Sequence, residues 1–221
     1  GGVTLAAPPP ADLPAAPSWE VARAELAAEL TVRLAAAAGA TVTAPRYPER
    51  SLPSPKRSLP VAAAIAFAGP DAVRFSLARA APGRPVRIEA AEIARHVPGN
   101  PAYAVRYAHA RAASGVRWAA STGSTAAVPR RPPADPGELA LLDALSWLPE
   151  RVAVAARRGR PDEFARYLEE LASVTIATLT SAAEPGGARA PGSDRLALAS
   201  AAQAALAAGL GLLGVSAPDR L

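Results

Sequence analysis

Two side chains that can recognise nucleic acid lie one helical turn apart near the middle of the chain. Tyr107 and Arg111 are four residues apart, so they share a face if this segment is helical. An aromatic ring can stack on an unpaired base, and a guanidinium can bond a phosphate or a base edge. Arg106, next to Tyr107, is a further candidate for contact with RNA. The alternative is that Tyr107 packs against the final helix and Arg111 is a solvated surface charge.

The remaining titratable residues give no catalytic pattern. The two histidines are His96 and His109. No Ser, Cys or carboxylate is set beside His109 to form a proton relay, so we interpret it as a packing residue. We therefore expect no catalytic residue, no metal site and no cofactor.

Arginines are densest in a stretch whose acidic neighbours permit two interpretations. The stretch can form an electrostatic track for RNA or a solvated helix face with internal ion pairs, and the interleaved acids favour the second interpretation. The arginines are Arg151, Arg157, Arg158, Arg160 and Arg166, and the acids are Glu150, Asp162, Glu163 and Glu169.

Composition favours a helical protein with a thin core. Half of the 221 residues are hydrophobic, most of these are alanine, and only 5% of the chain is aromatic. Alanine is the strongest helix former and fills little space. The absence of cysteine excludes disulfides, iron–sulfur clusters and thiolate zinc sites, and fits a reducing cytoplasm.

The net charge of +5 is carried by arginine, because Lys56 is the only lysine. Arginine suits phosphate recognition, although a GC-rich genome also encodes chains rich in alanine, arginine and proline. No run of roughly 18 or more uncharged apolar residues is present, so we expect no membrane span.

Prolines and glycines divide the chain into predicted helices. Residues 1–17 are expected to be a flexible lead-in, 18–99 a helical region with a proline-rich loop, and 100–221 a separate domain. Ser18 is a predicted N-cap and Gly39 a predicted helix stop. Helices are predicted at about 19–38, 60–69, 69–80, 88–96, 101–120, 138–147, 150–158, from 161 through Leu179, and 195–213. Loops are predicted at 43–60, 121–137 and 183–194.

Apolar residues at helical spacing predict which faces are buried. The sequence shows no convincing internal repeat and no alternation typical of a strand, so the C-terminal half is predicted to be an all-α helical bundle. Trp118 and Trp147 are interpreted as core anchors. The predicted stripes are Leu26, Leu30 and Leu34; Leu142, Leu145 and Leu148; and Phe164, Leu168, Leu171 and Leu179.

Four segments resemble one known domain, in its order. NPAYAVRYAHAR (100–111) and LLGVSAPDR (212–220) resemble the beginning and the end of the DALR-type anticodon-binding domain of arginyl-tRNA synthetases. GPDAVRFSLAR (69–79) and the segment 141–172 resemble the stretch before that domain and its central helices. The resemblance implies an all-α fold like that of a class I synthetase anticodon-binding domain, with a short helical N-terminal extension. It also implies that Arg220 and Leu221 lie where the chain end approaches the anticodon.

The chain departs from the family at three places. SVTIATLTSA follows the central helices where the family has aromatics and a histidine, and the basic residue of the final helix is missing. The last residue is Leu221 where the family has methionine, which keeps an apolar contact.

The synthetase motifs for adenylate formation are not found. Neither histidine lies in a HIGH-type tetrapeptide, fewer than 100 residues precede Asn100, and no glycine-rich phosphate loop is present. SPKRS (54–58) is a faint echo of the KMSKS-type loop or a chance loop. We therefore expect a cytoplasmic, non-catalytic relative that lacks most of the enzyme.

Two functions remain open from the sequence. The favoured one is binding of tRNA or another structured RNA through Tyr107, Arg106, Arg111, Arg220 and Leu221. The alternative is a protein-interaction or scaffold module that kept the bundle and lost RNA binding, with a protein partner in place of RNA.

Overall fold

The computed structural model describes residues 10–40, 59–123, 135–181 and 193–221, and all regular elements within them are helices. The all-α prediction is confirmed. The chain divides into two compact units. Unit 1 contains Gly1–Tyr103, Pro149–Arg166 and Leu212–Val215, and unit 2 contains Ala104–Leu148, Tyr167–Gly211 and Ser216–Leu221. The predicted domain boundaries at residues 17 and 99 stay a prediction.

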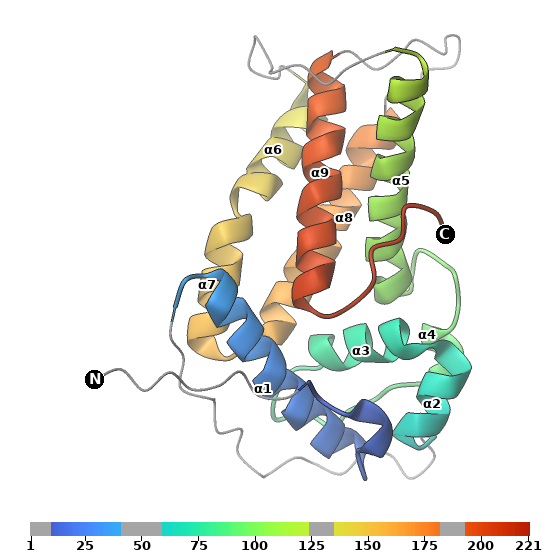
Figure 1. The fold of residues 1–221 in the computed structure, drawn as a ribbon, viewed down its shortest axis with the longest axis vertical. Helices are drawn as coiled ribbons and strands as arrows, with labels where there is room; N and C mark the ends of the chain where they lie inside the picture. Colours follow the sequence, from blue (N-terminus) through green and yellow to red (C-terminus); the bar gives the residue numbers. More distant parts are fainter. Residues whose placement is uncertain (1–9, 41–58, 124–134, 182–192) are drawn as a thin grey trace. The chain divides into compact units, whose positions relative to one another are not determined.

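Unit 1 is built around a short helical cluster (Figure 1). In it, α1 packs on α3, and α2 packs on α3, α4 and η1. Its elements are η1 (Leu13–Ala15), α1 (Trp19–Ala37), α2 (Val61–Ala68), α3 (Pro70–Arg79), α4 (Ala90–Ile93), α7 (Leu148–Arg158) and the first turn of α8 (Pro161–Ser181).

The ends of α1 follow the predicted signals. The Ser18 side chain accepts a hydrogen bond from Val21 N at 3.3 Å and caps the helix. Gly39 follows the last turn with φ of 66°, a conformation that favours glycine. Residues 10–17, part of the predicted lead-in, carry η1, whose Leu13 is buried. The predicted helix at 88–96 is a single turn, α4.

A buried carboxylate organises unit 1. Glu29 accepts hydrogen bonds from Ala11 N and Arg33 Nε, both at 2.9 Å, and forms an ion pair with Arg74. Arg74 Nε also donates to the carbonyl oxygen of Leu213 at 2.7 Å. Because the Arg74 and Glu29 side chains are largely removed from water, loss of Glu29 leaves the Arg74 charge costly to bury, whereas Glu29 keeps Arg33 as a partner if Arg74 is lost.

Unit 2 contains α6, α9 and most of α5 and α8 (Figure 1). Two hydrogen bonds define the relative direction of α6 and α8. Thr178 Oγ1 donates to Gly137 O at 3.0 Å, and Tyr167 Oη donates to Ala144 O at 2.8 Å. These bonds join opposite ends of the two helices, so α6 and α8 are antiparallel. The elements of unit 2 are α5 (Pro101–Ser121), α6 (Pro136–Ser146), α8 and α9 (Ser193–Leu212).

The thin core predicted from the alanine content is present in unit 2. Gly209 of α9 lies so close to α8 that a Cβ there would be 2.4 Å from Leu168 Cδ2. Alanines line the buried side of α5, including Ala108, Ala112 and Ala119. Small residues therefore let these backbones approach closely, and few bulky side chains are needed.

The prediction that Trp118 and Trp147 are core anchors is wrong. Trp118 on α5 is 42% exposed and Trp147 after α6 is 49% exposed, whereas the buried tryptophan is Trp19, whose Nε1 donates to Leu59 O at 2.8 Å. Leu142 is also exposed, because Leu141 is the leucine of α6 that turns inward.

The predicted burial is confirmed for the stripe of α1 and for the first three members of the stripe of α8, whereas Leu179 is half-buried. The segment Arg195–Leu212 of α9 is long and apolar enough to cross a membrane, with a mean hydropathy of 1.3. In the structure, 44% of this segment is buried, and its buried leucines pack within the protein. The fully enclosed members of the predicted stripes are Leu26, Leu30, Leu34, Phe164, Leu168 and Leu171. Most of the predicted loops and the whole SPKRS segment lie outside the described residues.

Candidate nucleic-acid interface

The start of α5 is fixed by Asn100. Its Oδ1 accepts a hydrogen bond from Ala102 N at 3.2 Å, and its Nδ2 donates to Ile93 O and Arg95 O at 2.7 and 2.8 Å. The side chain thus caps the helix and ties it to the segment that follows α4. Pro101 occupies the first helical position, where its missing N–H costs nothing. The Asn-Pro pair therefore sets the register of every later residue in α5.

That register directs Tyr107 and Arg111 to the surface. Tyr107 is 40% exposed, and Arg111 and Ser114 are exposed in the same row of the helix. Val105 and Ala108 are fully buried on the other side. Whether Tyr107 also packs against the final helix is not decided by this exposure. The Tyr107 ring and the Arg111 guanidinium therefore lie on one exposed face of α5, with the Ser114 hydroxyl about one turn beyond Arg111.

The C-terminal tail, Ser216–Leu221, lies against α5 (Figure 1). Arg106 Nη2 donates to Ser216 Oγ at 3.2 Å, and His109 Nδ1 contacts Pro218 O at 3.1 Å. A carbonyl oxygen only accepts, so the His109 Nδ1 carries the proton in this contact. Successive tail residues meet successive α5 residues, so the tail runs in the same direction as the helix. The expectation that the two ends of the C-terminal domain are adjacent is confirmed.

His109 is a structural residue at this contact. It is buried, with 2% of its surface exposed, and its Nδ1 contacts the backbone carbonyl oxygen of Pro218 in the tail. The interpretation of His109 as a packing residue is confirmed. Its position explains how a chain end with little apolar surface is held beside the helix.

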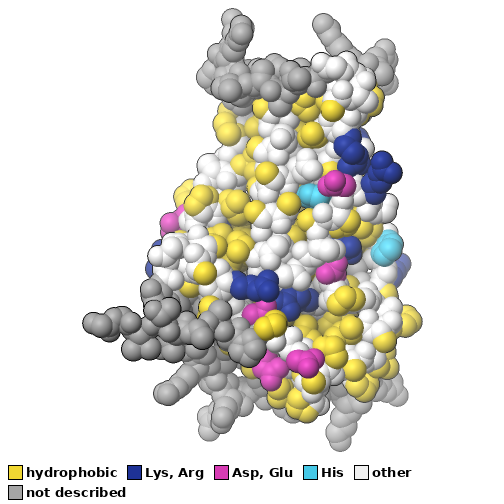
Figure 2. All heavy atoms as spheres, viewed as in Figure 1, with side chains coloured by type: hydrophobic (Ala, Val, Ile, Leu, Met, Phe, Trp, Pro, Cys, Tyr) yellow, Lys and Arg dark blue, Asp and Glu magenta, His cyan; other side chains and the backbone are white. Residues whose placement is uncertain are grey.

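The end of the tail adds a cation and an apolar side chain. Arg220 and Leu221 are exposed, and Asp219 between Pro218 and Arg220 is the acidic residue of the tail. Figure 2 shows Lys and Arg side chains gathered where α5 and the tail lie in Figure 1. The five candidate residues are thus carried by two adjoining elements, with Arg106 in direct contact with the tail. This surface presents an aromatic ring and guanidinium groups, which are able to stack on a base and to bind a phosphate.

A residue missed by sequence reasoning holds the segment before the tail. Arg74 binds Leu213 O, and its guanidinium lies against Gly214, where a Cβ would be 2.5 Å from Arg74 Nε. Gly214 also has φ of 68°. The segment Leu212–Val215 is therefore fixed within unit 1 by α3. The match of DAVRF (71–75) to the family segment was the available signal, but the sequence did not identify the partner of its arginine.

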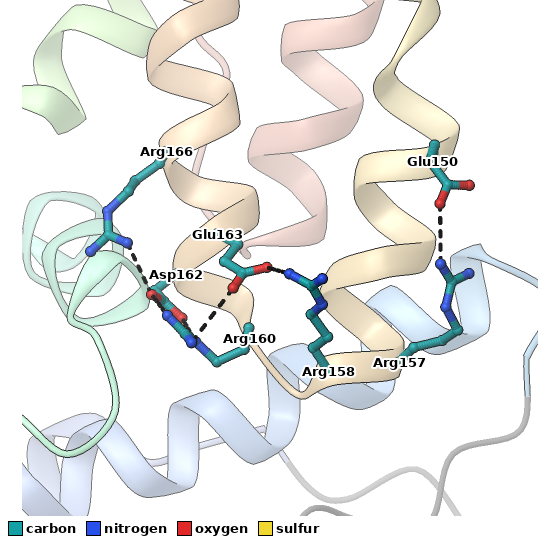
Figure 3. A network of polar contacts seen from close by, with 7 residues as sticks. All are labelled: Glu150, Arg157, Arg158, Arg160, Asp162, Glu163 and Arg166. Carbon is teal, nitrogen blue, oxygen red and sulfur yellow. Dashed lines mark hydrogen bonds and ion pairs between the residues drawn. The ribbon is translucent and has the colours of Figure 1, made fainter.

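The densest arginine stretch is occupied by internal ion pairs (Figure 3). Asp162 is 1% exposed in its side chain and is bonded by Arg160 through two contacts of 2.7 Å, and by Arg166 at 3.2 Å. Arg158 pairs with Glu163 at 3.2 Å. Arg157 pairs with Glu150 at 3.1 Å. These pairs support the interpretation of the stretch as a solvated, internally neutralised face.

Comparison with known proteins identifies the fold and its relatives. The sequence profile of the DALR anticodon binding domain matches residues 105–221, more than half of the chain. The chain belongs to this family. The DALR match begins within α5 and ends with the tail, so it includes both elements of the candidate interface.

The relatives of this DALR protein are arginine–tRNA ligases. The ligase of Frankia alni is 37% identical over 162 residues, covering 69% of this chain and 29% of the ligase. That of Bifidobacterium longum is 35% identical over 191 residues, covering 71% and 29%. The chain therefore spans about 29% of the length of these curated relatives.

Two solved structures share the fold. The arginyl-tRNA synthetase of Thermus thermophilus superposes with a TM-score of 0.59 at 29% identity, covering 89% of this chain and 32% of the synthetase. A putative arginyl-tRNA synthetase of Campylobacter jejuni gives a TM-score of 0.62 at 19% identity, covering 73% and 35%. The second likeness shows the fold alone.

Proposed function

We propose that this DALR protein binds the unpaired loop of tRNA or another structured RNA on the surface formed by α5 and the C-terminal tail. The observation that carries the proposal is the contact of the tail with α5 beside an exposed Tyr107 and Arg111. The ligases that share the domain act on tRNA by name, which makes an RNA loop the favoured ligand.

Each candidate residue has a defined part in this binding. Tyr107 stacks on one unpaired base, and Arg111, one turn along the same row, bonds a phosphate or a base edge. Arg220 adds a phosphate contact from the tail, and Leu221 packs against a base or ribose. Arg106 holds the tail in place through Ser216 and adds positive charge.

We further propose that this chain performs no aminoacylation by itself and works in the cytoplasm. Its 221 residues contain no HIGH-type tetrapeptide and correspond to less than a third of the length of the ligases they match. Arginine-dependent pyrophosphate exchange by the purified chain would contradict this part of the proposal.

Binding of a stem–loop RNA tests the main proposal. Fluorescence anisotropy is measured with a labelled stem–loop and with the same stem closed into a blunt duplex, at low salt. We expect the stem–loop to bind more tightly, and Arg111→Ala to weaken it by about 1–3 kcal/mol. Arg157→Ala is the matched control, since it also removes one exposed arginine, from an ion pair on α7. Equal affinity for both RNAs, or equal loss in both variants, would contradict a loop-specific α5 site.

One observation favours a protein-interaction function as the second candidate. Leu139, Leu142 and Trp147 are exposed on or just after α6, which is unusual for large apolar side chains. If no RNA binds at low salt, these residues become the next surface to test. Substitution of Leu142 by Arg would then be expected to change self-association or partner binding while leaving helicity intact.

A further inference from the structure

The helix α5 contains the same four-residue pattern twice. Val105-Arg106-Tyr107-Ala108 is followed eleven residues later by Val116-Arg117-Trp118-Ala119. Eleven residues are close to three full turns of an α-helix, so both copies face the same direction. Because α5 runs unbroken from Pro101 to Ser121, the repeat places two arginine–aromatic pairs in one row.

Burial is matched at the aromatic and alanine positions of the two copies, whereas Val105 is buried and Val116 is half-buried. Tyr107 is 40% exposed and Trp118 is 42% exposed. Ala108 and Ala119 are both fully buried. Each aromatic ring therefore stands on the surface directly above a buried alanine.

We propose that Trp118 is a second base-stacking platform, so that a single RNA strand runs along α5 and places bases on Tyr107 and Trp118. This inference rests on the proposed RNA-binding function and assigns a role to a residue that lies outside the four sequence segments that carry the resemblance. An indole offers a larger stacking surface than a phenol.

The charges between the two rings fit a nucleic-acid strand. Arg111 lies in the row between Tyr107 and Trp118, and Arg106 and Arg117 each precede one ring. No acidic residue occurs between Arg106 and Trp118. The row thus holds one cationic group, Arg111, between two stacking groups, a combination that binds single strands without sequence preference.

The spacing predicts the length of strand that the row accommodates. At a rise of about 1.5 Å per residue, the two rings are about 16 Å apart along the helix. With about 3.4 Å per stacked nucleotide, roughly five nucleotide steps separate the two stacked bases. A strand of about three nucleotides therefore reaches one ring only, and a strand of about eight reaches both.

Tryptophan fluorescence and affinity test this proposal with full-length protein and oligouridylates of about eight and about three nucleotides. We expect Trp118→Ala to weaken binding of the longer strand by about tenfold and to leave the shorter strand nearly unaffected. Trp118→Phe keeps an aromatic ring and should restore most of the affinity. Trp147→Phe is the matched control, because Trp147 is similarly exposed and lies just after α6, away from α5 in the sequence.

The outcomes separate this inference from the proposed function. Quenching by the longer strand should persist in Trp147→Phe and disappear in Trp118→Phe. If RNA binding depends on Tyr107 while Trp118→Ala binds both strands as the wild type does, the second platform is overturned and RNA binding stands. If no oligomer or stem–loop binds at low salt, both are overturned. Unchanged circular dichroism of each variant shows that the fold is intact.

Discussion

Three glycines near the C-terminus provide a graded test of how this structure is packed. Gly209, Gly211 and Gly214 lie within six residues, but an added methyl group meets a different environment at each. At Gly211 nothing lies within 4 Å. At Gly209 the Cβ would be 2.4 Å from Leu168 Cδ2, and at Gly214 it would be 2.5 Å from Arg74 Nε.

The expected free energies of unfolding follow from these contacts. Gly214→Ala forces a non-glycine residue to φ of 68°, which costs on the order of 1 kcal/mol. It also displaces Arg74 from Leu213 O, a charged hydrogen bond of about 1.5–3 kcal/mol. We expect a total loss of about 3 kcal/mol. Gly209→Ala overpacks the contact with Leu168 and should cost about 1–3 kcal/mol.

Gly211→Ala is the control in the same helix and should be neutral or stabilise by up to about 1 kcal/mol, since alanine is the better helix former. Urea unfolding followed by far-ultraviolet circular dichroism gives the three values. If Gly214→Ala unfolds at the same urea concentration as Gly211→Ala, the Arg74 contact does not stabilise the segment before the tail, and the reasoning is refuted.

Three further outcomes are expected. Glu29→Gln should lower the free energy of unfolding by about 3 kcal/mol, because Arg74 keeps a largely buried charge without its ionic partner; a urea midpoint equal to that of the wild type would contradict this. Asp135→Ala should cost about 0.5–2 kcal/mol by removing the cap on Gly137 N and Glu138 N, and unchanged thermal unfolding would argue against that cap. Deletion of residues 216–221 should weaken stem–loop binding while leaving helicity almost unchanged, whereas loss of helicity would show that the tail is needed for the fold.

Local sequence signals predicted the helices well because each signal acts over a few residues. Ser18 caps α1 through its own side chain, and Gly39 ends it through its own φ. The window around Ile88 failed because its helical pattern is weak and only one turn forms at Ala90–Ile93. Signals within a few residues were therefore enough to predict where most helices lie, but not the length of the short helix α4.

Burial of individual side chains depends on distant partners and was predicted less well. Trp118 is a large apolar residue, and only the register set by Asn100 shows that it faces solvent. The bond of Arg74 to Leu213 joins residues 139 positions apart, which no local pattern reveals. The repeat that contains Tyr107 and Trp118 was not identified from the sequence, although the predicted helix at 101–120 contains both copies, because its significance depends on the burial of each residue.

The contact between α5 and the tail was anticipated from the family resemblance. Physical reasoning from the residues alone gave the shared row of Tyr107 and Arg111, but it gave no reason for the chain end to approach that helix. The structure supplies this reason through Arg106 and His109, which bind Ser216 and Pro218. The role of the site residues in RNA binding stays a prediction.

The salt dependence of stem–loop affinity tests the central claim most directly. Each phosphate neutralised contributes roughly −0.7 to −0.9 to the slope of log K against log salt, so a few arginine contacts predict a wild-type slope of about −2 to −5. Arg111→Ala should make the slope less negative by roughly 0.7–0.9, while Tyr107→Ala should lose about 1–3 kcal/mol of affinity without changing the slope. Binding that is undetectable at low salt, or slopes and affinities identical in wild type and both variants, would contradict RNA binding on α5.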